Sequence, residues 1–180
     1  MEKYNRIKAL ISLDAVKYNF EQMKKNIKEG TKIIAVIKAD AYGHGAVPIA
    51  RMLEEFDYIW GFAAATAQEA LQLRKAGITR PILILGLVFE EYYKKLAEND
   101  VRMAVCDYET ARKFNKAAEA AGKKGLIHLA ADTGMTRIGF KDREESLEEI
   151  RRIAALPNVE IEGLFTHFAR ADEYDRTPAM

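Results

Sequence analysis

The residues with the clearest capacity for chemistry lie in the segment AVIKADAYGHGA, at 35–46. The β-branched run before Lys38 predicts a strand buried on both faces, which places Lys38 at its C-terminal end. A lysine amine that loses part of its solvation there is available for Schiff-base chemistry. Gly43 and Gly45 allow a tight turn into a following helix, and their exposed N–H groups could support a phosphate. A lysine beside a phosphate-binding turn indicates pyridoxal phosphate as a candidate cofactor.

Lys38 taken alone also fits a simpler interpretation. A lysine at a strand end often extends its amine into solvent, and glycines are common in ordinary βα turns. The choice between the two interpretations depends on which other groups the fold brings to the same place.

The elements that must position Lys38 follow an alternation of short apolar runs and longer amphipathic segments, which is typical of a parallel sheet. The apolar runs predict six strands, at 32–39, 58–65, 81–86, 102–107, 125–132 and 159–168. A helix is expected over 12–27, opening at Ser12 or Asp14. Another is expected over 66–77, where Thr66 is a candidate N-cap and Gly77 a candidate stop.

Six regularly spaced βα units predict an α/β fold, most of a (β/α)₈ TIM barrel, whose functional residues lie at the C-terminal ends of the strands. The count is two units short of a closed barrel. A doubly wound open sheet is the structural alternative, but no G-x-G-x-x-G fingerprint follows the first strand. The barrel is therefore the preferred prediction.

Composition favours a compact metabolic enzyme. The 180 residues allow one sizeable core, and 28 Lys and Arg against 27 Asp and Glu give a formal charge of +1, which offers no support for a nucleic-acid or membrane partner. No apolar stretch of membrane-spanning length or signal-peptide core is visible, so a cytoplasmic protein is expected. Cys106 lies in an apolar run and is expected to be a reduced, buried thiol without a catalytic role.

Four segments in order resemble one family. AVIKADAYGHGA closely resembles the cofactor-lysine signature of the alanine racemases, which are fold-type III pyridoxal-phosphate enzymes. The other three are similar to the second and third βα units, the fifth strand and loop, and the sixth strand and loop of that family. They are WGFAAATAQEALQLRKAGITRPILILG (60–86), HLAADTGMTRIGF (128–140) and EGLFTHFARADE (162–173).

The resemblance implies a role for five residues. Lys38 would form the internal aldimine with pyridoxal 5'-phosphate, and Tyr42 would bond the phosphate. Arg137 would contact the phenolic oxygen of the cofactor, and His167 would lie against its pyridine ring. Asp172 would fall near the substrate entrance.

Each of these roles competes with a structural one. Arg137 could pair with Asp132 or Asp142, and His167 could be satisfied by a backbone carbonyl. A zinc site made of His167 with His44 and His128 is not expected, because the three come from distant segments without a closely spaced ligand pair.

One position departs from the family pattern. Many alanine racemases carry a lysine, often carbamylated, after the His-Leu pair of the fifth strand, and this chain has Ala130 there. Arg137 must then be balanced by another acceptor, by water or by a bound anion.

The resemblance implies an alanine racemase that interconverts L- and D-alanine, supplies D-alanine for cell-wall precursors and acts as a homodimer. Lys38 would be one acid/base, while the opposite-face tyrosine belongs to a C-terminal β-domain of the partner subunit. Residues 1–180 would then be a truncated N-terminal barrel portion, inactive alone. A racemase of serine or another small amino acid and a non-catalytic pyridoxal-phosphate carrier barrel are the alternatives.

Overall fold

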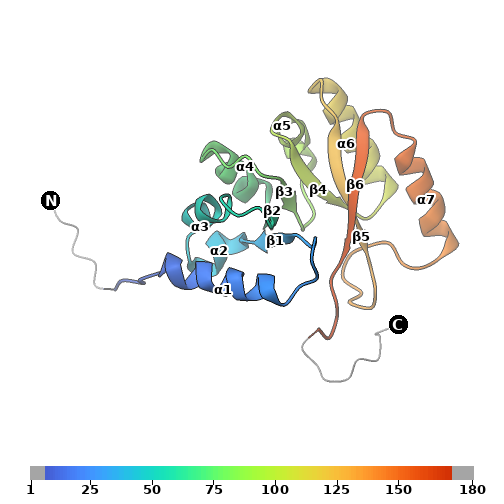
Figure 1. Ribbon diagram of the computed structural model, residues 1–180. Helices are drawn as coiled ribbons and strands as arrows, with labels where there is room; N and C mark the ends of the chain where they lie inside the picture. Colours follow the sequence, from blue (N-terminus) through green and yellow to red (C-terminus); the bar gives the residue numbers. More distant parts are fainter. Residues whose placement is uncertain (1–6, 172–180) are drawn as a thin grey trace.

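The computed structural model describes residues 7–171, which form one curled parallel sheet with helices along its outer side (Figure 1). The sheet has the order β1-β2-β3-β4-β5-β6, and every neighbouring pair is parallel. The strands are β1 (Ile33–Val36), β2 (Ile59–Ala64), β3 (Ile82–Ile84), β4 (Val101–Val105), β5 (Gly125–Ala131) and β6 (Val159–Thr166). The six predicted strands and the partial TIM barrel are confirmed.

The helices lie between the strands. They are α1 (Leu13–Lys25), α2 (Lys38–Gly43), α3 (Ala46–Leu53), α4 (Ala67–Lys75), the 3₁₀ helix η1 (Glu90–Tyr92), α5 (Tyr93–Glu98), α6 (Tyr108–Ala120) and α7 (Glu144–Ala154). No helix within residues 7–171 is both long enough and apolar enough to span a bilayer.

Local side-chain bonds explain where the two predicted helices begin and end. The Ser12 side chain accepts a hydrogen bond from the Ala15 amide and starts α1. Thr66 caps α4 in the same way, and Gly77 follows its end with a φ of 88°. Both helices predicted from the sequence are confirmed, with ends that differ by one or two residues.

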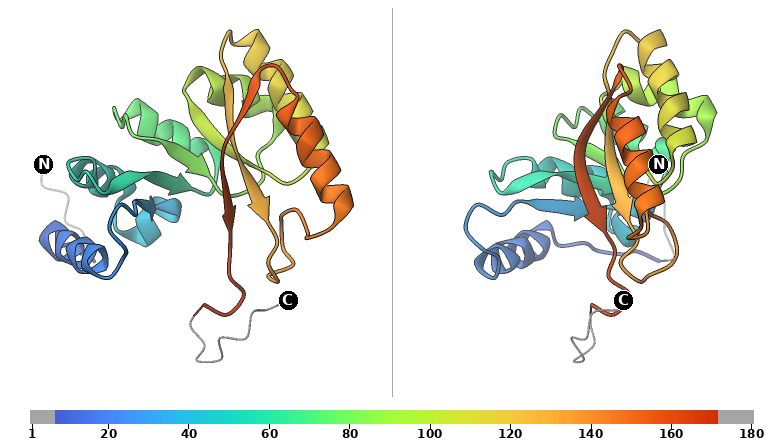
Figure 2. Two further views of the ribbon diagram at one scale, coloured as in Figure 1. Left: turned by 45° about the vertical axis from the view of Figure 1, so that its right-hand side comes forward. Right: turned by 90° about the vertical axis from the view of Figure 1, so that its right-hand side faces the viewer.

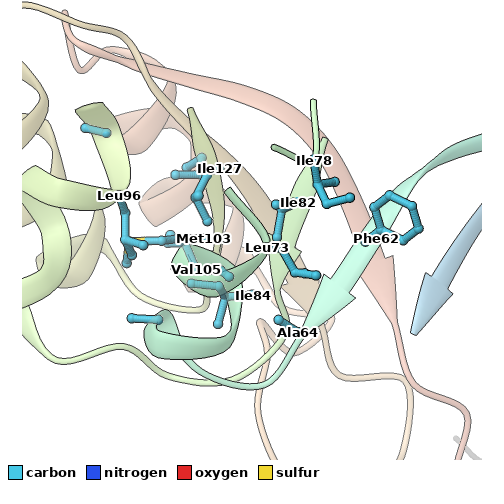
Figure 3. Packing of buried hydrophobic residues seen from close by; sticks show 14 of the residues in the cluster. Phe62, Ala64, Leu73, Ile78, Ile82, Ile84, Leu96, Met103, Val105 and Ile127 are labelled. Carbon is cyan, nitrogen blue, oxygen red and sulfur yellow. The ribbon is translucent and has the colours of Figure 1, made fainter. Parts of the chain in front are cut away.

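The sheet buries different residues on its two faces. Its convex face packs against the helices and forms the main apolar core, which includes Phe62, Ile82, Ile84, Met103 and Ile127 (Figure 3). Figure 2 shows that the sheet bends away from the helices, so its other face is concave.

A polar cluster joins strands across the concave side. The guanidinium of Arg102 on β4 donates two hydrogen bonds, of 2.9 and 2.8 Å, to the Glu162 carboxylate on β6. His128 Nε2 on β5 lies 3.0 Å from the same carboxylate. The His128 ring also lies 5.6 Å from the Trp60 ring on β2, and β2 and β5 are not neighbours in the sheet. The Arg102 hydrogen bonds, opposed in part by burial, hold the pKa of Glu162 below its usual range.

Candidate active site

The segment after β1 is a left-handed turn, although its hydrogen bonds give it the label α2. Ala39, Asp40, Ala41 and Tyr42 have φ between 50° and 54° and ψ between 38° and 48°. Each residue other than glycine in this region costs roughly 1–2 kcal/mol, so the turn carries roughly 4–8 kcal/mol of strain. Such strain persists only where the surroundings hold it, and it often marks a functional site.

The left-handed turn also corrects the expected first strand. The run 32–39 was expected to extend to Lys38, but β1 ends at Val36 and Lys38 opens the turn. The Ile37 amide still donates to the Ala63 carbonyl of β2 at 2.9 Å, so the residue before Lys38 remains anchored to the sheet. Lys38 is therefore presented at the C-terminal end of the strands, as predicted.

The Gly45 amide is not free to support a phosphate, contrary to expectation. The Gly45 amide donates to the Asp40 carbonyl at 2.8 Å, and the Ala46 amide donates to Asp40 Oδ1 at 2.7 Å. Asp40 therefore occupies the amides of Gly45 and of the first residue of α3. The expectation for Gly45 is wrong, because it took no account of the aspartate within the same segment, and the expectation for Gly43 stays a prediction.

Lys38 and Tyr42 lie close together. Lys38 Nζ is 5.9 Å from the centroid of the Tyr42 ring, and the tyrosine is 60% exposed. Within residues 7–171, Lys38 forms no salt bridge and the Tyr42 hydroxyl has no hydrogen-bond partner. Both groups are available to a ligand.

The loop that carries Arg137 is closed at its base and folded around Asp132. The Phe140 amide donates to the Ala130 carbonyl at 2.8 Å, and the Asp132 amide donates to the Phe140 carbonyl at 2.9 Å. Asp132 Oδ1 accepts from the amides of Gly134, at 3.1 Å, and Thr136, at 2.8 Å. These two hydrogen bonds lower the pKa of Asp132.

A hydroxyl pair ties the same loop to the end of β6. Thr133 Oγ1 lies 2.6 Å from Thr166 Oγ1. Thr166 directly precedes His167, so the Arg137 loop and the His167 segment are fastened to each other. Neither Asp132 nor Asp142 forms a salt bridge with Arg137 in the described part of the chain.

Arg137 and His167 line one cavity of about 310 Å³ at the C-terminal ends of the strands. Lys38 and Tyr42 are not among its lining residues, but the cavity begins at Val36, two positions before Lys38. Asp172 lies outside the described residues. The full lining is Ile34, Val36, Ala63, Leu83, Leu85, Ala130, Ala131, Met135, Arg137, Ile138, Phe165, Thr166 and His167.

A profile of the alanine racemase N-terminal domain matches residues 11–180. The chain belongs to the alanine racemase family. It is 43% identical to the alanine racemase of Methanococcus maripaludis over 94% of this chain and 45% of that protein. The solved alanine racemase of Clostridium difficile 630 superposes with a TM-score of 0.88 at 45% identity, over 91% of this chain and 45% of that one.

A histidine racemase from Leuconostoc mesenteroides is also similar, with a TM-score of 0.82 and 33% identity over 92% of this chain and 44% of that chain. The chain thus spans a little under half the length of the relatives that it matches. The solved structures similar to this chain therefore include racemases whose names specify different amino acids.

The donor set in this alanine racemase domain fits an anionic, planar cofactor. Lys38, Arg137 and His167 have no salt bridge with any carboxylate in residues 7–171, and two of the three line the cavity. A cavity of this size is within the range of small-molecule sites. Ala130 lines the cavity too, so no lysine at that position supports Arg137.

The remaining titratable candidates are engaged elsewhere. His44 Nδ1 lies 3.0 Å from the Ala41 carbonyl oxygen, and His128 belongs to the polar cluster on the concave side. Burial, with Asp107 nearby, raises the pKa of the half-buried Cys106 thiol. In the described part of the chain, no three His, Cys, Asp or Glu side chains are grouped so as to hold a metal ion.

The sequence interpretation did not assign the roles that four other residues have in the site, namely Asp40, Glu69, Asp132 and Thr133. Thr66 and Glu69 have the spacing of a capping box, and that signal could have drawn attention to Glu69. The other contacts depend on how loops fold and leave no comparable pattern in the sequence.

Proposed function

We propose that this chain supplies the lysine half of an alanine racemase site in a homodimeric enzyme. The observation that carries the proposal is one cavity, close to the strand that presents Lys38, that both Arg137 and His167 line without carboxylate partners. Arg137 comes from the loop after β5, and His167 directly follows β6. Membership of the alanine racemase family supports the reaction type.

Four residues of the chain would hold pyridoxal phosphate. Lys38 would bind its carbonyl carbon through the amine, and Tyr42 would donate its hydroxyl to the phosphate. Arg137 carries a permanent charge that suits the phenolic oxygen, and His167 offers a flat ring against which the pyridine can lie. When bound, the cofactor supplies a ring that withdraws electrons from the α-carbon of an amino acid.

The Lys38 amine, once free, moves the α-proton of the substrate on one face as a general base or acid. Racemisation requires a second proton-transfer group on the opposite face. By the family resemblance this group is a tyrosine from the C-terminal β-domain of the partner subunit, outside this chain. The complete site would therefore form only between two subunits.

A second candidate function is racemisation of a different amino acid. This candidate is supported by the similarity to a histidine racemase, which is 33% identical to the chain and has a closely similar fold. A non-catalytic pyridoxal-phosphate carrier barrel is a third candidate. The experiment that separates the racemases from the carrier is α-proton exchange, which a carrier does not catalyse.

Reductive trapping is expected to place pyridoxal phosphate on Lys38. Borohydride treatment of the cofactor-loaded chain, followed by peptide mapping, should find the pyridoxyl group on the peptide that contains Lys38, because this amine is free of carboxylate partners and near the cavity. Lys38→Arg should lose the label while keeping the charge. A label on another lysine in the unmodified chain would contradict the assignment.

Arg137→Ala is expected to weaken cofactor binding by about 10- to 150-fold. A hydrogen bond to a charged group contributes about 1.5–3 kcal/mol, and each 1.36 kcal/mol corresponds to a factor of ten. Equilibrium dialysis with pyridoxal phosphate measures the change. Arg143→Ala is the matched control, because Arg143 is the N-cap residue of α7 and does not line the cavity.

The variant Ala130→Lys should be tolerated, since it restores the residue that many relatives have beside the arginine.

If Arg137→Ala left the dissociation constant for pyridoxal phosphate unchanged, Arg137 would not belong to the proposed cofactor site.

A further inference from the structure

Glu69 lies in the first turn of α4, yet its carboxylate reaches the residue that follows Lys38. Its Oε2 accepts from the Ala65 amide at 2.7 Å and from the Thr66 amide at 3.3 Å. Its Oε1 accepts from the Ala39 amide at 2.8 Å, 30 positions earlier in the chain. One carboxylate thus joins two separate segments.

The capping of α4 accounts for only one of the two oxygens. In a capping box, the acidic side chain returns to the backbone amide at the start of its own helix, and Oε2 does this. The bond from Oε1 to Ala39 adds nothing to α4. It satisfies the first amide of the strained turn instead.

The position of this bond matters because Ala39 is the first left-handed residue after Lys38. At the far end of the turn, Asp40 secures Gly45 and Ala46 through its carbonyl and carboxylate. Glu69 is the corresponding support at the near end. Without the Glu69 carboxylate, the Ala39 amide would have no hydrogen-bond acceptor. The turn would then lose one of the contacts that hold its unfavourable backbone angles.

We infer that Glu69 is a positioning residue that holds the left-handed turn and thereby fixes the direction of the Lys38 side chain toward the cofactor. The role of Lys38 toward a cofactor rests on the proposed function. The Glu69–Ala39 contact can be tested without any cofactor. Glu69 itself is not one of the residues that line the cavity. In this role it does not contact the reacting atoms.

The chain provides two matched controls. Glu54 uses one oxygen to accept from the amides of Thr79 and Arg80, at 2.7 and 3.0 Å, before β3 and therefore at the opposite end of the strands. Glu54→Ala removes a similar loop-holding carboxylate far from Lys38. Thr66→Ala removes the helix cap on α4 but leaves the Glu69–Ala39 bond in place.

The experiment compares Glu69→Ala with both controls and the unmodified chain by two measurements. The first is amide hydrogen exchange of the peptide containing Ala39, without cofactor. The second is the rate at which pyridoxal phosphate and cyanoborohydride label Lys38. Circular dichroism and cooperative thermal unfolding show that each variant is folded.

In Glu69→Ala, exchange at Ala39 should rise by about tenfold or more and labelling of Lys38 should slow by about tenfold, as expected for loss of a hydrogen bond to a charged acceptor. Both controls should keep the unmodified values. Ala39 exchange equal to that of the unmodified chain would overturn the inference, and so would an unchanged labelling rate. Failure of the unmodified chain to label Lys38 would instead contradict the proposed function, while Ala39 exchange would still decide whether Glu69 holds the turn.

Discussion

In deuterated water, the 180-residue chain loaded with pyridoxal phosphate is expected to exchange the α-proton of one alanine enantiomer much faster than it produces the other. Lys38 is the proton-transfer group that the described site provides, and it can act on one face of the α-carbon only. Loss of a positioned general acid or base typically lowers the rate about 10²–10⁴-fold, so the rate of interconversion should be lower than the rate of exchange by about this factor.

Nuclear magnetic resonance of the α-position measures deuteration, and chiral chromatography measures the ratio of enantiomers. Lys38→Ala should show neither exchange nor interconversion above the level of free cofactor. Serine and histidine, tested in parallel, compare the candidate substrates. Rapid interconversion of both alanine enantiomers by this chain would show that it contains its own second proton-transfer group, and the half-site proposal would be wrong.

Gly61→Ala is expected to destabilise the sheet severely. A Cβ at Gly61 would lie 2.3 Å from the Pro81 carbonyl oxygen, which is backbone and also accepts from the Phe62 amide. Neither group can move without breaking the pairing of β2 with β3. Overpacking of this kind costs about 3 kcal/mol, which corresponds to a fall in Tm of about 6–12 °C for a chain of this size.

Gly30→Ala is the matched control for thermal unfolding. Gly30 has a φ of 80°, and no other atom lies within 4 Å of the place that a Cβ would take. The substitution therefore costs only the backbone strain of about 1–2 kcal/mol. Equal Tm values for the two variants would mean that the β2–β3 junction can relax, contrary to the close contact seen at Gly61.

Much of the fold could be predicted because its signals are local. The apolar runs located all six strands, and Ser12, Thr66 and Gly77 marked helix ends whose bonds involve residues only a few positions away. The convergence of Arg137 and His167 also followed from the sequence, since parallel strands bring their C-terminal ends to one edge.

The backbone around Lys38 could not be predicted in the same way. Ala39 and Tyr42 have no intrinsic preference for left-handed angles, and one bond that supports the turn comes from Glu69, 30 residues away. The expected phosphate support at Gly45 was wrong for a related reason. The Asp40 carbonyl accepts from the Gly45 amide, and only the folded turn brings the Asp40 carboxylate to Ala46.

The polar cluster on the concave side also sets an order for assembly of the sheet. Arg102 and Glu162 are 60 positions apart, so during synthesis the guanidinium emerges long before its carboxylate. Removing a cation from water without its partner is unfavourable, which keeps the surroundings of Arg102 hydrated while only the strands up to β5 have formed. Pairing of β6 with β5 supplies Glu162, so we expect the water around Arg102 to leave only when β6 docks.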